Sequence, residues 1–109
     1  MISEKEFNAL LLCAIDDGLK QIFKKAAMKT IYSYLDKQYS LKREDIPEKL
    51  DIFIQGLENF FESGAVVVRL VILKNLYSSL GLEVRHVQRD QNLVDCVERL
   101  KSHFCTRRK

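Results

Sequence analysis

Apolar residues recur at spacings of three and four along most of the chain, which is the pattern of amphipathic helices. The first stripe follows Ser3 and Glu6, which have the spacing of a helix capping box. It consists of Phe7, Leu10, Leu11, Ala14, Ile15, Leu19, Ile22 and Phe23. This stripe predicts a helix of about five turns. Asp16, Asp17 and Gly18 disfavour the middle of a helix, so we expect a bend or a restart there.

Two further apolar stripes predict a second and a third helix. The second stripe consists of Ala27, Met28, Ile31 and Leu35, and we expect that helix to end near Tyr39. The third stripe places its apolar residues on one helix face: Leu50, Phe53, Ile54, Leu57, Phe60 and Phe61. Asp45 and Pro47 are typical of a helix start, as N-cap and first-turn residue. Ser63 and Gly64 are expected to close the third helix.

Residues 65–73 are ambiguous, because a run rich in β-branched residues suits a buried strand as well as a buried helix. The apolar pattern continues to Leu80 and ends at Gly81, which is too long for an ordinary strand and suits a glycine C-cap. We therefore predict a central apolar helix near 65–80 that is buried almost all round. The alternative is an α+β fold in which 82–87 forms the partner strand.

A last apolar stripe predicts a C-terminal helix capped by Asp90. Its members are Leu93, Val94, Val97, Leu100 and Phe104. Four glycines and one proline give the chain little of the turn chemistry that an all-β domain needs. At 109 residues the chain suits one hydrophobic core. We predict an all-α fold, a compact four- to five-helix bundle that forms a single helical domain over 1–109.

Composition and cysteine usage indicate a soluble protein of the cytoplasm. Apolar residues make up 47% and charged residues 30%, values that are ordinary for a folded domain. Cys13, Cys96 and Cys105 are odd in number and widely spaced, which predicts buried thiols in a reducing compartment. The N-terminus lacks a secretory signal pattern. The longest apolar run is far shorter than the roughly 20 residues that cross a bilayer, so we expect no membrane contact.

The sequence shows no pattern of metal ligands. A zinc site needs several His, Cys or carboxylate side chains that converge, and neither a Cys-x-x-Cys pair nor a His-Glu-x-x-His helix occurs. Cys96 and His103 share a helix face, so a zinc site would require Cys13 or His86 to meet them in the fold. We predict no metal and no cofactor.

Catalytic motifs are also missing from the sequence. There is no Gly-x-Ser-x-Gly elbow and no glycine-rich phosphate loop. The pairs Asp16-Asp17 and Glu44-Asp45 are expected to cap helices or lie in turns. We predict no catalytic residues, and the alternative is an enzyme whose site assembles only in the folded chain.

Basic clusters make nucleic-acid binding the strongest competing function, although the net charge is a mild +3. Lys20, Lys24 and Lys25 are expected on one helix. More basic residues gather near the C-terminus: Arg99, Lys101, and the candidate phosphate contacts Arg107, Arg108 and Lys109. The third and fourth helices resemble a helix-turn-helix outline. The apolar run over 65–73 leaves almost no polar face to read bases, which argues against sequence-specific DNA recognition.

Four tyrosines form the candidate interaction surface: Tyr32, Tyr34, Tyr39 and Tyr77. Tyrosine combines a large contact area with a polar tip and is enriched at binding hot spots. Tyr34 is the best placed, since it lies roughly opposite the buried stripe of its helix. The alternative is that each tyrosine seals the edge of the core. An apolar helix near 65–80 is likewise either enclosed by the bundle or covered by a second subunit.

Several segments between residues 7 and 82 resemble the Nitrosopumilus output domain family. They are the tyrosine-rich helix Ile31–Leu41, the Ile-Pro turn within Lys42–Lys49, Phe53, Leu57, Phe60, Gly64–Ala65, and the Leu-Tyr-x-x-Leu-Gly end within Leu76–Leu82. The resemblance implies an archaeal helical output module of signalling proteins and transfers no catalytic residues. Residues 83–109 would be a helical extension beyond the similar part.

Taken together, the residues and the resemblance favour a non-enzymatic helical protein-interaction module, an output or adaptor domain in archaeal signalling that self-associates, most simply as a homodimer. The alternative is a small basic nucleic-acid-associated protein. We also expect Asp in place of Leu70 or Ile72 to unfold the domain, because an unpaired charge in the core is costly.

Overall fold

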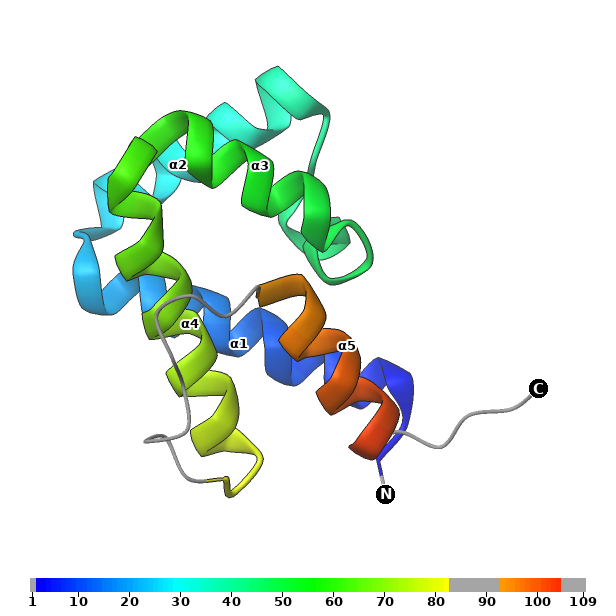
Figure 1. The fold of residues 1–109 in the computed structure, drawn as a ribbon. Helices are drawn as coiled ribbons and strands as arrows, with labels where there is room; N and C mark the ends of the chain where they lie inside the picture. Colours follow the sequence, from blue (N-terminus) through cyan, green and yellow to red (C-terminus); the bar gives the residue numbers. More distant parts are fainter. Residues whose placement is uncertain (1, 83–92, 105–109) are drawn as a thin grey trace.

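The computed structural model describes residues 2–82 and 93–104, and this part of the chain is helical with no β-strand (Figure 1). Its elements are α1 (Glu4–Ile22), α2 (Lys25–Tyr39), the 3-10 helix η1 (Arg43–Glu48), α3 (Leu50–Phe61), the 3-10 turn η2 (Glu62–Gly64), α4 (Ala65–Ser79) and α5 (Leu93–Phe104). The predicted all-α bundle is confirmed. The α+β alternative is wrong for 65–73, and its partner strand over 82–87 lies mostly outside the described residues.

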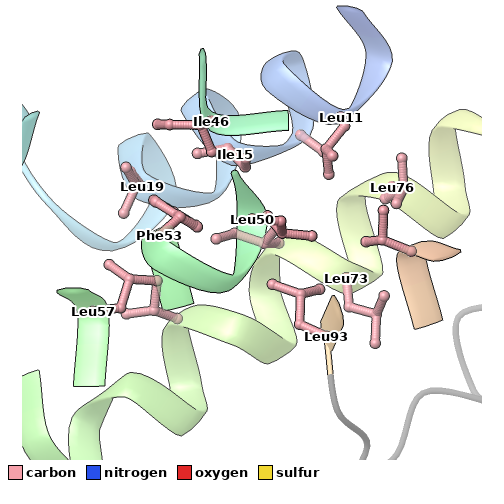
Figure 2. Close-up of a cluster of buried hydrophobic side chains, with 14 of the residues drawn as sticks. Leu11, Ile15, Leu19, Ile46, Leu50, Phe53, Leu57, Leu73, Leu76 and Leu93 are labelled. Atoms are coloured by element: carbon pink, nitrogen blue, oxygen red, sulfur yellow. The ribbon is translucent and has the colours of Figure 1, made fainter. Parts of the chain in front are cut away.

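Apolar side chains from all five helices and from η1 form one buried cluster. Figure 2 shows part of this core, where Leu11, Ile15 and Leu19 of α1 face side chains of α3 and α4. Ile46 of η1 lies beside Ile15, and Leu93 of α5 lies beside Leu73 of α4. Helix α1 packs most extensively on α4. This pair is the centre of the bundle, and α2 lies with α3 on one side of it (Figure 1).

Helix α1 runs without interruption through Asp16, Asp17 and Gly18, so the helix does not restart there. The glycine serves the contact with α4, because a Cβ at Gly18 would lie 3.1 Å from Ile72 Cγ1. Asn75 of α4 fixes the same contact with two hydrogen bonds: its Nδ2 donates to the carbonyl of Ala14 at 3.4 Å, and its Oδ1 accepts from Gln21 Nε2 at 3.3 Å. Tertiary packing thus outweighs the poor helix propensity of this segment.

The predicted capping box at the start of α1 is confirmed. The Glu6 backbone N–H donates to Ser3 Oγ at 3.1 Å, and the Ser3 N–H donates to Glu6 Oε1 at 3.3 Å. Helix α2 ends at Tyr39 as expected, and Ser40 follows in the left-handed conformation with φ 52°.

The expected helix start at Asp45 is wrong. Arg43–Glu48 form η1, and α3 begins at Leu50 after Lys49, whose φ and ψ are not helical. Helix η1 directs the Ile46 side chain into the core, where it is fully buried. Helix α3 ends at Phe61, where Glu62 takes φ 55°, one residue before the expected Ser63-Gly64 closure.

The predicted helix near 65–80 is α4, but it is not buried all round. One face supplies the core residues Ala65, Val68, Ile72, Leu73 and Leu76. Val67 is 49% exposed, and Leu70 is half-buried. An almost wholly apolar sequence carries no period that could reveal which face meets α1 and α3.

Helix α5 confirms the predicted last stripe and lies against α1 and α3 (Figure 1). Lys101 Nζ pairs with Glu4 Oε1 at 2.8 Å, and the Ile2 N–H donates to the carbonyl of Phe104 at 3.0 Å. The proposed cap Asp90 lies outside the described residues. Among the described helices, none is both long and apolar enough to cross a bilayer.

Candidate functional site

A shallow aromatic groove lies between α2 and the end of α3. It has a volume of about 500 Å³ and is lined by Lys29, Thr30, Ser33, Tyr34, Lys37, Gln38 and Phe60. We call this surface the aromatic groove. Tyr34 is half-buried and Phe60 is 37% exposed, so the two rings offer apolar area to solvent between two lysines.

The rings of the groove belong to a continuous series of aromatic contacts. The centroids of Tyr34 and Phe60 lie 4.8 Å apart, and Phe60 meets Phe61 edge-on at the same distance. Phe61 in turn stacks on Phe23 at 5.2 Å, and Tyr34 contacts Tyr39 edge-on at 6.0 Å. Asn59 Nδ2 donates to Tyr39 Oη at 2.6 Å. These contacts hold the exposed ring of Phe60 against a fixed aromatic base.

Helices α2 and α3 approach closely enough to form the groove because of Gly56. A Cβ at this position would lie 2.5 Å from Leu35 Cδ2 and 3.3 Å from Tyr39 Cε2. The expectation that Phe60 and Phe61 share the buried face of α3 is wrong for Phe60. Successive helical residues point about 100° apart, and here Phe60 takes the outer direction.

A second hollow, which we call the charged cleft, lies between α1, α2 and η1. Its volume is about 610 Å³, and it is lined by Asp16, Asp17, Lys20, Lys25, Met28, Lys29, Tyr32 and Arg43. Lys29 lines both this cleft and the aromatic groove.

Asp16 joins three elements at the charged cleft. The Tyr32 hydroxyl of α2 donates to Asp16 Oδ1, and Arg43 Nε of η1 donates to both carboxylate oxygens, at 3.1 and 3.0 Å. Arg43 Nη2 donates to Oδ2 as well. The expected capping or turn role of Asp16 is therefore wrong, since it is a mid-helix residue that ties α2 and η1 to α1.

These contacts shift the pKa values of all three groups. Burial alone would raise the pKa of the Asp16 carboxyl, but the hydrogen bonds from Arg43 and Tyr32 outweigh it and hold this pKa below its ordinary value of 3.8. Burial and the bond to Asp16 raise the pKa of Tyr32, and the bond to Asp16 raises that of Arg43. At neutral pH the cluster is an ionised Asp16–Arg43 pair with a protonated Tyr32.

The prediction that Lys20, Lys24 and Lys25 lie on one helix is wrong. Lys20 belongs to α1, whereas Lys25 is the first residue of α2 and Lys24 is its N-cap. Lys24 makes no side-chain capping bond, and the first turn of α2 has no acidic residue. Cations at a helix N-terminus oppose the helix dipole, so α2 begins unfavourably.

The four candidate tyrosines do not form one surface. Tyr34 lines the aromatic groove, Tyr39 contacts Tyr34 but does not line the groove, and Tyr32 lines the charged cleft. Tyr77 lies with Cys96, Arg99, Leu100 and His103 around a separate hollow of about 300 Å³. The alternative role at the edge of the core fits all four tyrosines, since each is half-buried against the core cluster.

The described residues contain no group of three or more His, Cys, Asp or Glu side chains that could hold a metal ion. Cys96 is buried as expected, and burial raises the pKa of its thiol, with Arg99 acting in the opposite direction. Cys13 is exposed, so the expectation of a buried thiol is wrong there. Cys105, His86 and the candidate phosphate contacts Arg107, Arg108 and Lys109 lie outside the described residues.

No family model, no curated protein and no solved structure matches this chain. The resemblance to the Nitrosopumilus output domain family therefore stays a prediction from the sequence.

The sequence does not predict the role of three residues that define these surfaces. The apolar stripe of α3 places Phe60 in the core, and no motif pairs Asp16 with Arg43. The sequence feature that could have indicated an exposed Phe60 is its position next to Phe61, because adjacent helical residues point in different directions. No signal links Asp16 with Arg43, because 27 residues separate them in the sequence and the fold brings them together.

Proposed function

We propose that this protein is a non-enzymatic helical protein-interaction module that holds a partner protein in the aromatic groove. The observation that carries the proposal is the Phe60 ring, exposed on the protein surface and packed on Tyr34 between Lys29 and Lys37. Aromatic residues are enriched at the centres of protein interfaces, and tyrosine is among the residues that dominate binding energy there.

The composition of the groove indicates what kind of partner it suits. The two rings offer an apolar contact for an aliphatic or aromatic anchor, and the lysines at the rim favour acidic side chains beside it. An acidic amphipathic segment of another protein has this chemistry.

Self-association through the same groove is a second candidate. A two-fold symmetric dimer would bring Lys29 and Lys37 of one copy close to those of the other, and like charges across an interface disfavour it. We therefore favour a different protein as the partner.

The cellular context of the proposal comes from the sequence. The resemblance to the Nitrosopumilus output domain family supports an output or adaptor role in archaeal signalling. Dispersed cysteines, of which Cys13 and Cys96 are free thiols, support a cytoplasmic location.

The proposal is tested by affinity capture from lysate of the host, comparing the tagged wild type with a Tyr34→Ser/Phe60→Ser double variant. A Gln55→Ser variant is the matched control, because Gln55 is exposed on α3 and does not line the groove. Every capture is made with and without nuclease, and retained proteins are identified by mass spectrometry.

We expect a stoichiometric partner that survives nuclease, is retained by Gln55→Ser and is lost from the double variant. Equal retention by the double variant would contradict the groove as the binding surface. Loss of all retained material after nuclease would favour the alternative of a small basic nucleic-acid-associated protein. Circular dichroism of each variant verifies that the helices are intact.

A further inference from the structure

We propose that the charged cleft binds the phosphate groups of a small polyphosphate ligand such as a nucleotide. This site is distinct from the aromatic groove, and its existence does not depend on the protein partner proposed above. The two surfaces meet at Lys29.

The charge of the cleft suits an anion. Four basic side chains line it, Lys20 from α1, Lys25 and Lys29 from α2, and Arg43 from η1. Two carboxylates accompany them, Asp17 and the Asp16 that pairs with Arg43, so the lining keeps an excess of positive charge. Within the described part of the chain, no ion pair is formed by the three lysines. Their ammonium groups are therefore available to phosphate oxygens, which strongly favour such donors.

Arg43 is held in position for the same task. Its Nε and Nη2 donate to Asp16, and its Nη1 donates no hydrogen bond to a described residue. The Arg43 side chain is 48% exposed, so this nitrogen can reach a ligand. Because Asp16 fixes the guanidinium, little side-chain entropy is lost when Arg43 binds an anion.

The size and the apolar part of the cleft favour a ligand larger than phosphate. About 610 Å³ is within the usual range of small-molecule sites. Met28 and Tyr32 are half-buried beside the cations and offer apolar surface on which a planar base can lie. The cations surround one hollow instead of following an extended stripe, which favours a small ligand over a nucleic-acid strand.

The test is a titration of the ¹⁵N-labelled full-length chain with ATP and, separately, with inorganic pyrophosphate, without divalent metal and at constant salt. Binding is monitored by two-dimensional amide spectra and measured by calorimetry. The cleft variant is Lys20→Gln/Lys25→Gln. The control is Lys49→Gln/Lys74→Gln, which removes the same charge from exposed positions away from the cleft.

ATP is expected to shift the amides of Lys20, Lys25, Lys29 and Arg43 in a saturable manner. The cleft variant should bind ATP at least about tenfold more weakly, because it removes two charged donors to the phosphate oxygens. The affinity of the control variant for ATP should stay within about twofold of the wild-type value, because salt screens distant surface charges. A Phe60→Ser variant should bind ATP as the wild type does, which separates this site from the proposed function.

The two probes distinguish the sources of the phosphate. Tighter binding of ATP identifies a nucleotide, in which the base contacts Met28 and Tyr32, whereas equal binding of pyrophosphate identifies a free polyphosphate. Absence of saturable shifts, or equal weakening in the control variant, would overturn the proposal. A single-stranded oligonucleotide that shifts the same amides at lower concentrations than ATP would also overturn it, in favour of nucleic acid.

Discussion

Helices α2 and α4 have the same length, 15 residues, but they use their side chains differently. Helix α4 supplies five buried residues to the core, whereas α2 supplies two, Ile31 and Leu35. The outer face of α2 lines both the aromatic groove and the charged cleft. Helix α2 needs only two side chains for the core, so its other side chains are available to line the candidate binding surfaces.

The largest effect should follow from a charge placed in the core face of α4. Ile72→Asp should unfold the domain, because an unpaired buried carboxylate costs more than about 4 kcal/mol, close to the whole stability of a small domain. Leu70→Asp should lower the free energy of unfolding by only roughly 1–3 kcal/mol, since Leu70 is half-buried. Thermal unfolding followed by circular dichroism checks both, and equal loss in the two variants would show that α4 is enclosed on both faces.

Two phenylalanines of α3 sharpen the same contrast within one helix. Phe53 is fully buried, so Phe53→Ala should lower the free energy of unfolding by about 3–5 kcal/mol. Phe60→Ala should cost less than about 1 kcal/mol, because it removes exposed area and ring contacts with Tyr34 and Phe61. Urea denaturation measures both values. A large loss of unfolding free energy in Phe60→Ala would show that the Phe60 ring stabilises the fold.

The Asp16 cluster should contribute less than the core and should depend on pH. Asp16→Asn should lower the free energy of unfolding by about 1–2 kcal/mol at neutral pH, because it weakens the bonds to Tyr32 and Arg43. The pKa of Asp16 is lowered in the folded state, so this contribution is fully present above the ordinary value of 3.8. It is lost as the pH falls through the folded pKa.

The stability difference between wild type and Asp16→Asn should therefore be constant from neutral pH to about pH 5 and should shrink below pH 3.8. Urea titrations at a series of pH values measure this difference. A difference that is independent of pH would show that the carboxylate charge does not act through this cluster.

The smallest effect concerns the start of α2. Lys24→Ser should raise the free energy of unfolding by about 1 kcal/mol, because serine caps a helix and lysine at this position does not. Lys74→Ser, in the middle of α4, is the control and should not stabilise the domain. If Lys24→Ser is neutral, the unfavourable charge at this helix start is compensated elsewhere.

The five helices of the described residues are predictable from the sequence, because the period of apolar residues is a local property. The stripe from Phe7 to Ile22 and the capping box at Ser3 were sufficient for α1. The continuity of α1 at Gly18 could not be predicted in the same way, because the contact of Gly18 with Ile72 depends on the position of α4.

The candidate surfaces were predicted in part. Tyr34 lines the aromatic groove, and its place roughly opposite the buried stripe of its helix follows from the period of apolar residues. The partner ring Phe60 and the pair Asp16–Arg43 required the packing of α3 and η1, because their contacts join residues far apart in the sequence. Distant pairs of this kind leave no trace in a single sequence.

The central claim is that the outer surface of α2 and α3 binds a protein, and site-specific photo-crosslinking tests it most directly. A benzophenone amino acid replaces Phe60 in one tagged chain and Asp51, which is exposed at the start of α3, in a control chain. Both are irradiated in lysate of the host. We predict one discrete adduct from position 60 and none from position 51. No adduct from position 60, or the same adduct from both positions, would contradict the account.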